Sequence, residues 1–165
     1  MYLIGDIGNT DIKICLFNSN LKLVKKIRLS TKNLNKKYIY KNLKFIKKFN
    51  NQINKILFSS VVPSVFKLIK EFLKKIIKIK CRELKNCNLK NLINVKVNKY
   101  QIGSDRLANA ISAIDNRNNF IIIDFGTATN FDVVINDQYI GGILAPGVEL
   151  SLSNLIEKAS LIPKI

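Results

Sequence analysis

The chain contains no histidine, and this absence excludes several kinds of active site. Neither a Ser-His-Asp triad nor a Cys-His nucleophile can form without it, and no histidine is available to ligate a metal ion. The three cysteines, Cys15, Cys81 and Cys87, match no metal-binding spacing, so we expect them to be free thiols. Acid–base chemistry must therefore come from carboxylates, lysine or tyrosine.

Long apolar runs and an export signal are also missing. No uninterrupted apolar stretch approaches the roughly 20 residues that span a bilayer. Residues Met1–Asp6 lack a basic segment and reach a carboxylate too early for a signal peptide. The apolar content of 47% and the length of 165 residues are typical of a globular chain with a real core. We therefore expect a cytoplasmic protein without a membrane partner, built as one domain or two small lobes.

Acidic residues are scarce: 11 of them stand against 28 lysines and arginines, which gives a net charge of +17. Such a surface could bind nucleic acid or anionic lipid. However, lysine is spread along the chain together with asparagine and isoleucine, whereas arginine, which grips phosphate groups bidentately, is rare. Compositional bias therefore explains the charge better, and nucleic acid is not the expected partner. The carboxylates that persist beside glycine, threonine or arginine are more informative: Asp6, Asp11, Asp105, Asp124 and Asp132.

A strand–turn–strand–turn–strand pattern occurs twice, over 2–29 and over 120–144. In each copy the first strand leads into an aspartate and a glycine turn. The other expected elements are a helix over 34–49, a strand over 53–62, a helix from Pro63 to Ile76, short strands and loops over 77–100, and helices over 107–114 and 148–159. This order predicts an α/β fold in which helices follow the hairpins.

The two glycine turns, Asp6–Thr10 and Asp124–Thr129, are candidate phosphate sites. Glycine lets the backbone approach a ligand closely, and the neighbouring hydroxyl and amide groups can donate to phosphate oxygens. The aspartate at the strand end can hold a cation against those phosphates. One such turn alone is more often an ordinary turn. Two of them, each at the start of a repeat, favour a protein that holds ATP between two lobes.

Five motifs in the same order resemble the type III pantothenate kinases of the sugar-kinase/actin superfamily. They are Asp6–Thr10, Ser59–Pro63, Gly103–Arg106, Asp124–Thr129 and Gly141–Gly147. The resemblance implies a two-lobed, actin-like (ribonuclease H-like) α/β fold with mixed sheets, with lobes over 1–116 and 117–165. It also implies a homodimer that uses ATP, Mg2+ and K+ or NH4+. The reaction would phosphorylate pantothenate to 4'-phosphopantothenate, the first step of coenzyme A biosynthesis. Members of the family are usually longer, so we expect an incomplete second lobe with exposed apolar surface.

The resemblance further implies roles for individual residues. Asp105 would be the general base that takes the proton of the pantothenate hydroxyl, Asp6 would organise Mg2+, and Asp124 would bind the monovalent cation. The residues expected to bind ATP are Asp6, Ile7, Gly8, Asn9, Thr10, Asp11, Ile12, Lys13 and Thr127. Those expected at the substrate are Tyr100, Gly103, Ser104, Asp105 and Arg106, of which Arg106 would pair with the pantothenate carboxylate. Phosphoryl transfer needs mainly positioning and charge neutralisation, so this site requires no histidine.

Two alternatives stay open at this point. The Gly103–Arg106 segment could simply start a helix, with Ser104 or Asp105 as the cap and Arg106 paired at the surface. In addition, a short and strongly basic relative could be a noncatalytic, nucleic-acid-binding or transcriptional regulator, whose affinity for DNA would fall steeply with salt. The survival of Asp105 and Asp124 in an acid-poor chain favours the enzyme.

Overall fold

The structure is a computed structural model that describes residues 1–32, 34–115 and 117–159. The chain forms two compact units. The first contains Met1–Asn88 and Gly103–Asp105, and the second contains Leu89–Ile102 and the residues from Arg106 onward. The lobe boundary expected at residue 116 stays a prediction. Each unit is built around its own β-sheet, and the expected α/β architecture with mixed sheets is confirmed.

The first unit has a five-stranded sheet in the order β3-β2-β1-β4-β5. Its strands are β1 (Tyr2–Ile7), β2 (Asp11–Phe17), β3 (Leu23–Ser30), β4 (Lys55–Ser60) and β5 (Cys81–Glu83), and a short 3-10 helix η2 (Leu84–Asn86) follows. β2 is antiparallel to both of its neighbours, whereas β1, β4 and β5 run parallel to one another. Buried residues alternate along β1 and β2, so one face of this sheet carries the core.

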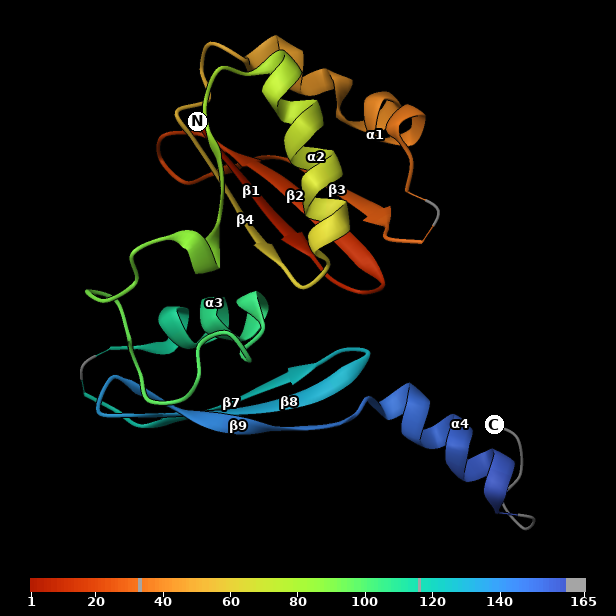
Figure 1. Cartoon of the computed structure of the whole chain (residues 1–165), viewed down its shortest axis with the longest axis vertical. Helices are drawn as coiled ribbons and strands as arrows, with labels where there is room; N and C mark the ends of the chain where they lie inside the picture. The colour runs from red at the N-terminus through yellow and green to blue at the C-terminus, as the bar shows by residue number, and fades with distance from the viewer. Residues whose placement is uncertain (33, 116, 160–165) are drawn as a thin grey trace. The chain divides into compact units, whose positions relative to one another are not determined.

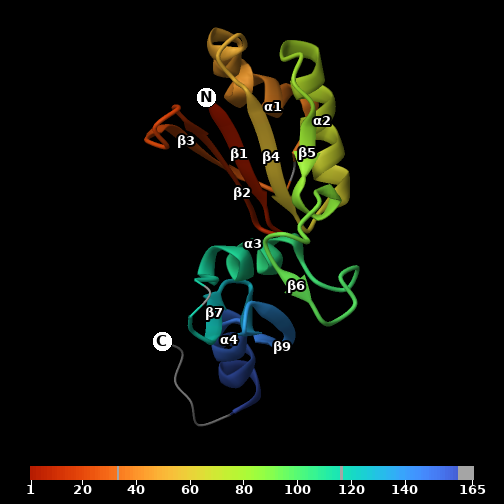
Figure 2. The same ribbon diagram turned by 90° about the vertical axis from the view of Figure 1, so that its left-hand side faces the viewer.

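Two helices cover that face (Figure 1). Both α1 (Lys36–Leu43) and α2 (Pro63–Ile76) contribute apolar side chains to the same core as β1 and β2. Figure 2 shows α2 lying along the sheet. The side chain of Asn35 caps α1 by accepting a hydrogen bond from the backbone N–H of Tyr38 at 2.9 Å. At the start of α2, Pro63 needs no N–H partner, which is why proline suits the first turn of a helix.

The single helix expected over 34–49 is wrong in its second half, because Lys44–Phe49 form a 3-10 helix, η1. Leu43, Ile46 and Phe49 stand three residues apart and all pack on the core. A helix with three residues per turn keeps such positions on one face, whereas an α-helix would rotate them away from it. Packing of these three side chains on the core therefore outweighs the local preference for an α-helix.

The second unit has a four-stranded sheet in the order β6-β9-β8-β7. Its elements are β6 (Asn94–Val95), α3 (Ser104–Ala113, which begins in the first unit), β7 (Phe120–Phe125), β8 (Ala128–Ile135), β9 (Gln138–Pro146) and α4 (Val148–Lys158). β7, β8 and β9 are consecutive antiparallel strands, as β1, β2 and β3 are in the first unit. The predicted repeat is confirmed. Asn136 and Asp137 make the tight β8–β9 turn with φ of 47° and 60°, values that Asn and Asp tolerate.

One face of this second sheet is apolar and exposed. Ile121, Ile123 and Phe125 alternate along β7 and are 71%, 50% and 70% exposed, and Ile143 on β9 is 70% exposed. The register joins them into one surface, because Phe131 of β8 lies between Ile123 and Ile143. The expectation of exposed apolar surface is confirmed for the residues that the structure describes.

Two further findings concern the cysteine thiols and the helices that could cross a membrane. Within the described ranges Cys15, Cys81 and Cys87 are all free, as expected, and burial raises the pKa of the Cys81 thiol to about 11. In the same ranges, no helix combines the length and apolar character that crossing a bilayer requires.

Packing at the middle of β1 generates the first testable prediction. Gly5 lies opposite Phe58 of β4, and a β-carbon at Gly5 would overlap the fully buried Phe58 ring. We expect Gly5→Ala to lower the free energy of unfolding by about 1–3 kcal/mol, because the ring has no room to move. Urea denaturation measures the effect. The neighbouring Ile4→Ala, which is partly exposed, should cost less, and a Gly5→Ala protein as stable as wild type would contradict this packing.

Candidate functional site

Two of the five motifs, and the Gly103–Asp105 part of a third, lie in the first unit. Asp6, near the carboxyl end of β1, stands in register with Lys13 of β2 and with Ser59 of β4. Residues in register share a face of the sheet, so the carboxylate, the ammonium and the hydroxyl form one row. The Ser59 hydroxyl oxygen is buried and makes no hydrogen bond with any described residue. Open α/β sheets bind ligands at the carboxyl ends of their parallel strands, which is where Asp6 and Ser59 lie.

The first glycine turn is held by backbone hydrogen bonds and by Thr31. The Gly8 N–H donates to the carbonyl of Asp11 at 2.9 Å, and the Thr31 hydroxyl donates to the carbonyl of Gly8 at 2.8 Å. Thr31 also donates its N–H to the carbonyl of Thr10 at 2.9 Å. Sequence reasoning missed Thr31, which follows β3 and carries no local signal of this contact.

The residues expected at the phosphates differ in what they offer to a ligand. Asn9, Thr10 and Lys13 are exposed, whereas the side chains of Ile7 and Ile12 are fully buried in the core. The two isoleucines have only main-chain groups to offer.

Asp11 is engaged in an ion pair at the base of the hairpin. Its carboxylate accepts a hydrogen bond from the guanidinium of Arg28 on β3. This hydrogen bond is the main reason why the pKa of Asp11 lies below its ordinary value; desolvation opposes it, and the charges of Arg28 and Lys13 lower the pKa further. The pair is exposed, so its contribution to stability is small.

The third motif starts α3. Ser104 is its first residue and is fully buried, and its hydroxyl donates to the carboxylate of Glu83, the last residue of β5. A β-carbon at Gly103 would collide with the Asp105 carboxylate and lie 3.5 Å from Val61. Gly103 therefore leaves room for Asp105 beside the segment that follows β4. The sequence signal for Glu83 was only that it is one of few acids in the chain.

In the second unit, Arg106 is buried against β8. Its Nε donates to Oδ1 of Asp132 at 2.8 Å, and its Nη2 lies 2.6 Å from the same oxygen. The Tyr139 hydroxyl of β9 also donates to this oxygen. The sequence marked Asp132 as an informative carboxylate but assigned it no role, and it did not mark Tyr139.

The fourth and fifth motifs meet in the same unit. Asp124 of β7 accepts a hydrogen bond from the Asn109 side chain of α3 at 3.1 Å and stands in register with Asn130, whose buried Oδ1 has no partner among the described residues. The exposed turn residue Thr127 accepts a hydrogen bond from the N–H of Gly147 at 3.1 Å. A β-carbon at Gly147 would press into this turn, only 2.6 Å from the Thr127 carbonyl. The second glycine turn therefore packs directly against Gly147, the residue that precedes α4.

Metal binding at these aspartates would need further oxygens. Within the described part of the chain, no group of three or more Cys, Asp or Glu side chains is gathered for a metal ion. Mg2+ commonly uses one or two carboxylates together with water and phosphate oxygens, so the Asp6 carboxylate fits that mode. Asp124 beside the unpartnered Asn130 oxygen offers two oxygen ligands to a larger cation.

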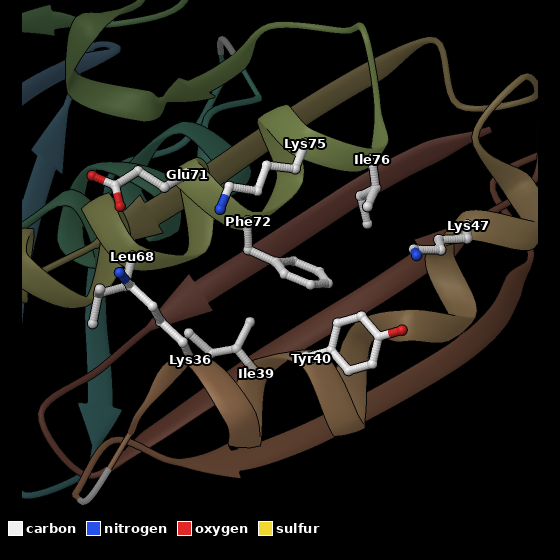
Figure 3. A pocket seen from close by; sticks show the side chains of 9 residues that line it. All are labelled: Lys36, Ile39, Tyr40, Lys47, Leu68, Glu71, Phe72, Lys75 and Ile76. Atoms are coloured by element: carbon white, nitrogen blue, oxygen red, sulfur yellow. The ribbon is translucent and has the colours of Figure 1, made fainter.

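A cavity of about 330 Å3 lies elsewhere in the first unit, between α1 and α2 (Figure 3). None of its lining residues belongs to the motifs: they are Lys36, Ile39, Tyr40, Lys47, Leu68, Glu71, Phe72, Lys75 and Ile76. Tyr100 is 81% exposed, and its backbone N–H donates to the Asn98 side chain at 3.0 Å. The candidate functional site is therefore the strand-end motifs and not this cavity.

The structure thus carries glycine turns, strand-end aspartates and a helix that starts with a carboxylate on an α/β fold with mixed sheets. The chain belongs to the type III pantothenate kinase family, whose model matches residues 2–165. It is 58% identical over 165 residues to the type III pantothenate kinase of Pelagibacter ubique and 33% identical over 175 aligned positions to that of Desulforapulum autotrophicum.

The matches cover the whole of this chain but only part of each relative. The chain spans 66% of the length of both curated kinases. A solved structure from Campylobacter jejuni, described as a candidate Baf family transcriptional activator, aligns with a TM-score of 0.53 and 20% identity. That alignment covers 98% of this chain and 63% of the other, and it shows a shared fold.

The Thr31 brace generates a prediction for the first glycine turn. Thr31→Val removes the hydroxyl that donates to Gly8, so we expect the free energy of unfolding to fall by about 1 kcal/mol. Hydrogen exchange at residues 8–11 should become faster in this variant. Thr31→Ser keeps the hydroxyl and is the matched control. Identical exchange in the valine and serine variants would show that the brace has no effect on the turn.

Proposed function

We propose that the protein transfers the γ-phosphoryl group of ATP to the primary hydroxyl of pantothenate, forming 4'-phosphopantothenate and ADP. This would be the first step of coenzyme A biosynthesis, in the cytoplasm. Family membership and the 58% identity to a type III pantothenate kinase support the substrate. The observation that carries the proposal is that Asp6, Ser59 and the Gly103–Asp105 segment belong to one unit, with a strand-end carboxylate and a helix-start carboxylate.

On the ATP side, Asp6 would hold Mg2+ and the turn from Gly8 to Lys13 would hold the phosphates. Exposed Asn9, Thr10 and Lys13 can donate directly, and Thr127 would contact ATP from the second glycine turn. Bound Mg2+ supplies charge neutralisation at the phosphates. Ile7 and Ile12 would act through their main chain only, because their side chains are in the core. Asp11 would help to set the shape of the turn through its pair with Arg28.

On the acceptor side, Asp105 would accept the proton of the pantothenate hydroxyl as its oxygen attacks phosphorus and ADP leaves. Gly103 leaves room for this carboxylate, and Ser104 ties the helix start to Glu83. Arg106 would bind the pantothenate carboxylate and Tyr100 would line the acceptor pocket. Asp124, with Asn130 beside it, would bind K+ or NH4+.

The first experiment is coupled ADP release with pantothenate, Mg-ATP and K+. We expect pantothenate-dependent turnover that Asp105→Asn lowers about 100- to 10,000-fold, the usual range for loss of a general base. Omitting K+ or Mg2+ should also lower the wild-type rate. Asp115→Asn, an exposed aspartate outside the motifs, is the control and should keep the rate. Absence of any pantothenate-dependent ADP release by folded wild-type protein would overturn the proposed function.

We also propose that the protein is a homodimer. The exposed apolar side chains of β7, β8 and β9 form one continuous face, and such a face marks an interaction surface, whereas scattered single apolar side chains do not. Sedimentation should then give a mass close to twice 18.8 kDa. Phe125→Asp on this face should shift the equilibrium toward monomer, whereas Lys74→Asp on α2 should not. A wild-type protein that stays monomeric at millimolar concentration would refute the dimer.

A further inference from the structure

The side chain of Arg106 is held by one oxygen of one buried carboxylate. Asp132 is fully buried, and its Oδ1 accepts from Nε of Arg106 at 2.8 Å and lies 2.6 Å from Nη2. The Tyr139 hydroxyl donates to the same oxygen, and Tyr139 is itself only 1% exposed. Three donor atoms from α3 and β9 therefore converge on one atom of β8.

This arrangement is poorly suited to stabilising the fold. Removing two charges from water costs much of what their attraction returns, so buried ion pairs are often no better for stability than apolar side chains. The second oxygen of Asp132, Oδ2, is also buried and has no hydrogen-bond partner among the described residues. An unsatisfied buried acceptor carries a further penalty. The pair therefore calls for an explanation other than stability.

Gly142 makes room for the pair. It stands in register with Asp132 across β8 and β9. A β-carbon at Gly142 would overlap the backbone carbonyl oxygen of Phe131 on β8, and it would lie 2.5 Å from Nη2 of Arg106 and 2.8 Å from Oδ1 of Asp132. These are distances at which one of the two charged groups must move. A side chain at this position of the Gly141–Gly147 motif is therefore excluded both by the β8 backbone and by the buried pair, so Gly142 leaves Arg106 and Asp132 in place.

We infer that Asp132, Tyr139 and Gly142 form an arginine socket, which fixes the plane of the Arg106 guanidinium so that it binds the carboxylate of the acceptor. The inference rests on the proposed function. A guanidinium has five N–H donors, so one carboxylate oxygen can orient it without using all of them. Asp132 is then a positioning residue that acts through Arg106. The socket makes the enzyme select acceptors that carry a carboxylate.

The first test measures the socket without using activity. The full chain is labelled with 15N-arginine, and solvent exchange of each arginine Nε–H is measured by NMR. Arg28, Arg82 and Arg117 are exposed, so we expect Arg106 alone to exchange at least about 10-fold more slowly than the others, as buried hydrogen-bonded groups do. Asp132→Asn and Tyr139→Phe should abolish or reduce this protection. Asp137→Asn, at the β8–β9 turn, is the control and should preserve it. An unprotected Arg106 in wild type would overturn the socket.

The second test measures selectivity. Pantothenate is compared with pantothenol, in which a hydroxymethyl group replaces the carboxylate. We expect Tyr139→Phe and Asp132→Asn to lower the ratio of the two kcat/KM values by about 10-fold or more, the order expected when a charge-assisted bidentate contact is lost. The KM for ATP should not change. A purely structural role would lower turnover of both acceptors equally, and an unchanged ratio would overturn the inference while leaving the proposed function intact.

A wild-type protein that phosphorylates neither acceptor would overturn the proposed function. In that case, the binding of pantothenate and of pantothenol to the wild-type protein tests the arginine socket. Saturating pantothenate, but not pantothenol, should shift the Arg106 Nε–H resonance of the wild-type protein. A resonance that neither compound shifts would show Arg106 to be a structural ion pair only. In every variant the backbone amide spectrum serves as the check that the chain is folded.

Discussion

The pairing of β1 with both of its neighbours is the constraint on which the first unit depends. β1 is antiparallel to β2 and parallel to β4, and this double pairing brings Lys13 and Ser59 to the two sides of Asp6. The same register sets Gly5 under the Phe58 ring, so the core face admits no larger side chain at that position. Because side chains alternate along a strand, the residues that fill the core also decide which residues face the site.

The two units handle polar groups differently. In the first unit the motif side chains stand at strand ends, where Asn9, Thr10 and Lys13 remain exposed. In the second, Arg106 and Asp132 are buried together, and Asp124 is tied to Asn109. Exposed donors suit a ligand that arrives with water and cations, such as a nucleotide. A buried and oriented guanidinium suits the recognition of one chemical group on a small acceptor.

Local patterns predicted most of the secondary structure. Short apolar runs and apolar alternation between turn residues predicted β1, β2, β7 and β8 close to their observed bounds, and Pro63 marked the start of α2. The same reasoning failed at Lys44–Phe49, where the spacing of three belongs to a 3-10 helix. The candidate site was predicted as motifs, but the supporting residues Thr31, Glu83 and Tyr139 were not. Thr31 and Glu83 lie 23 and 21 residues along the chain from the groups they contact. Tyr139 lies only 7 residues from Asp132, but its contact depends on the β8–β9 register, and none of the three carries a local signal of its contact.

The sequence by itself determined most of the elements, the repeat of two hairpins, the glycine turns and the family. These follow from properties of neighbouring residues: side-chain period, turn chemistry and the order of short motifs. Only the tertiary structure decided that Asp132 holds Arg106, that Gly142 makes room for both, and that Ser104 is tied to Glu83. Such contacts depend on strand register and on how a helix packs on a sheet. A chain sets these through the burial of the whole core and not through any single stretch of residues.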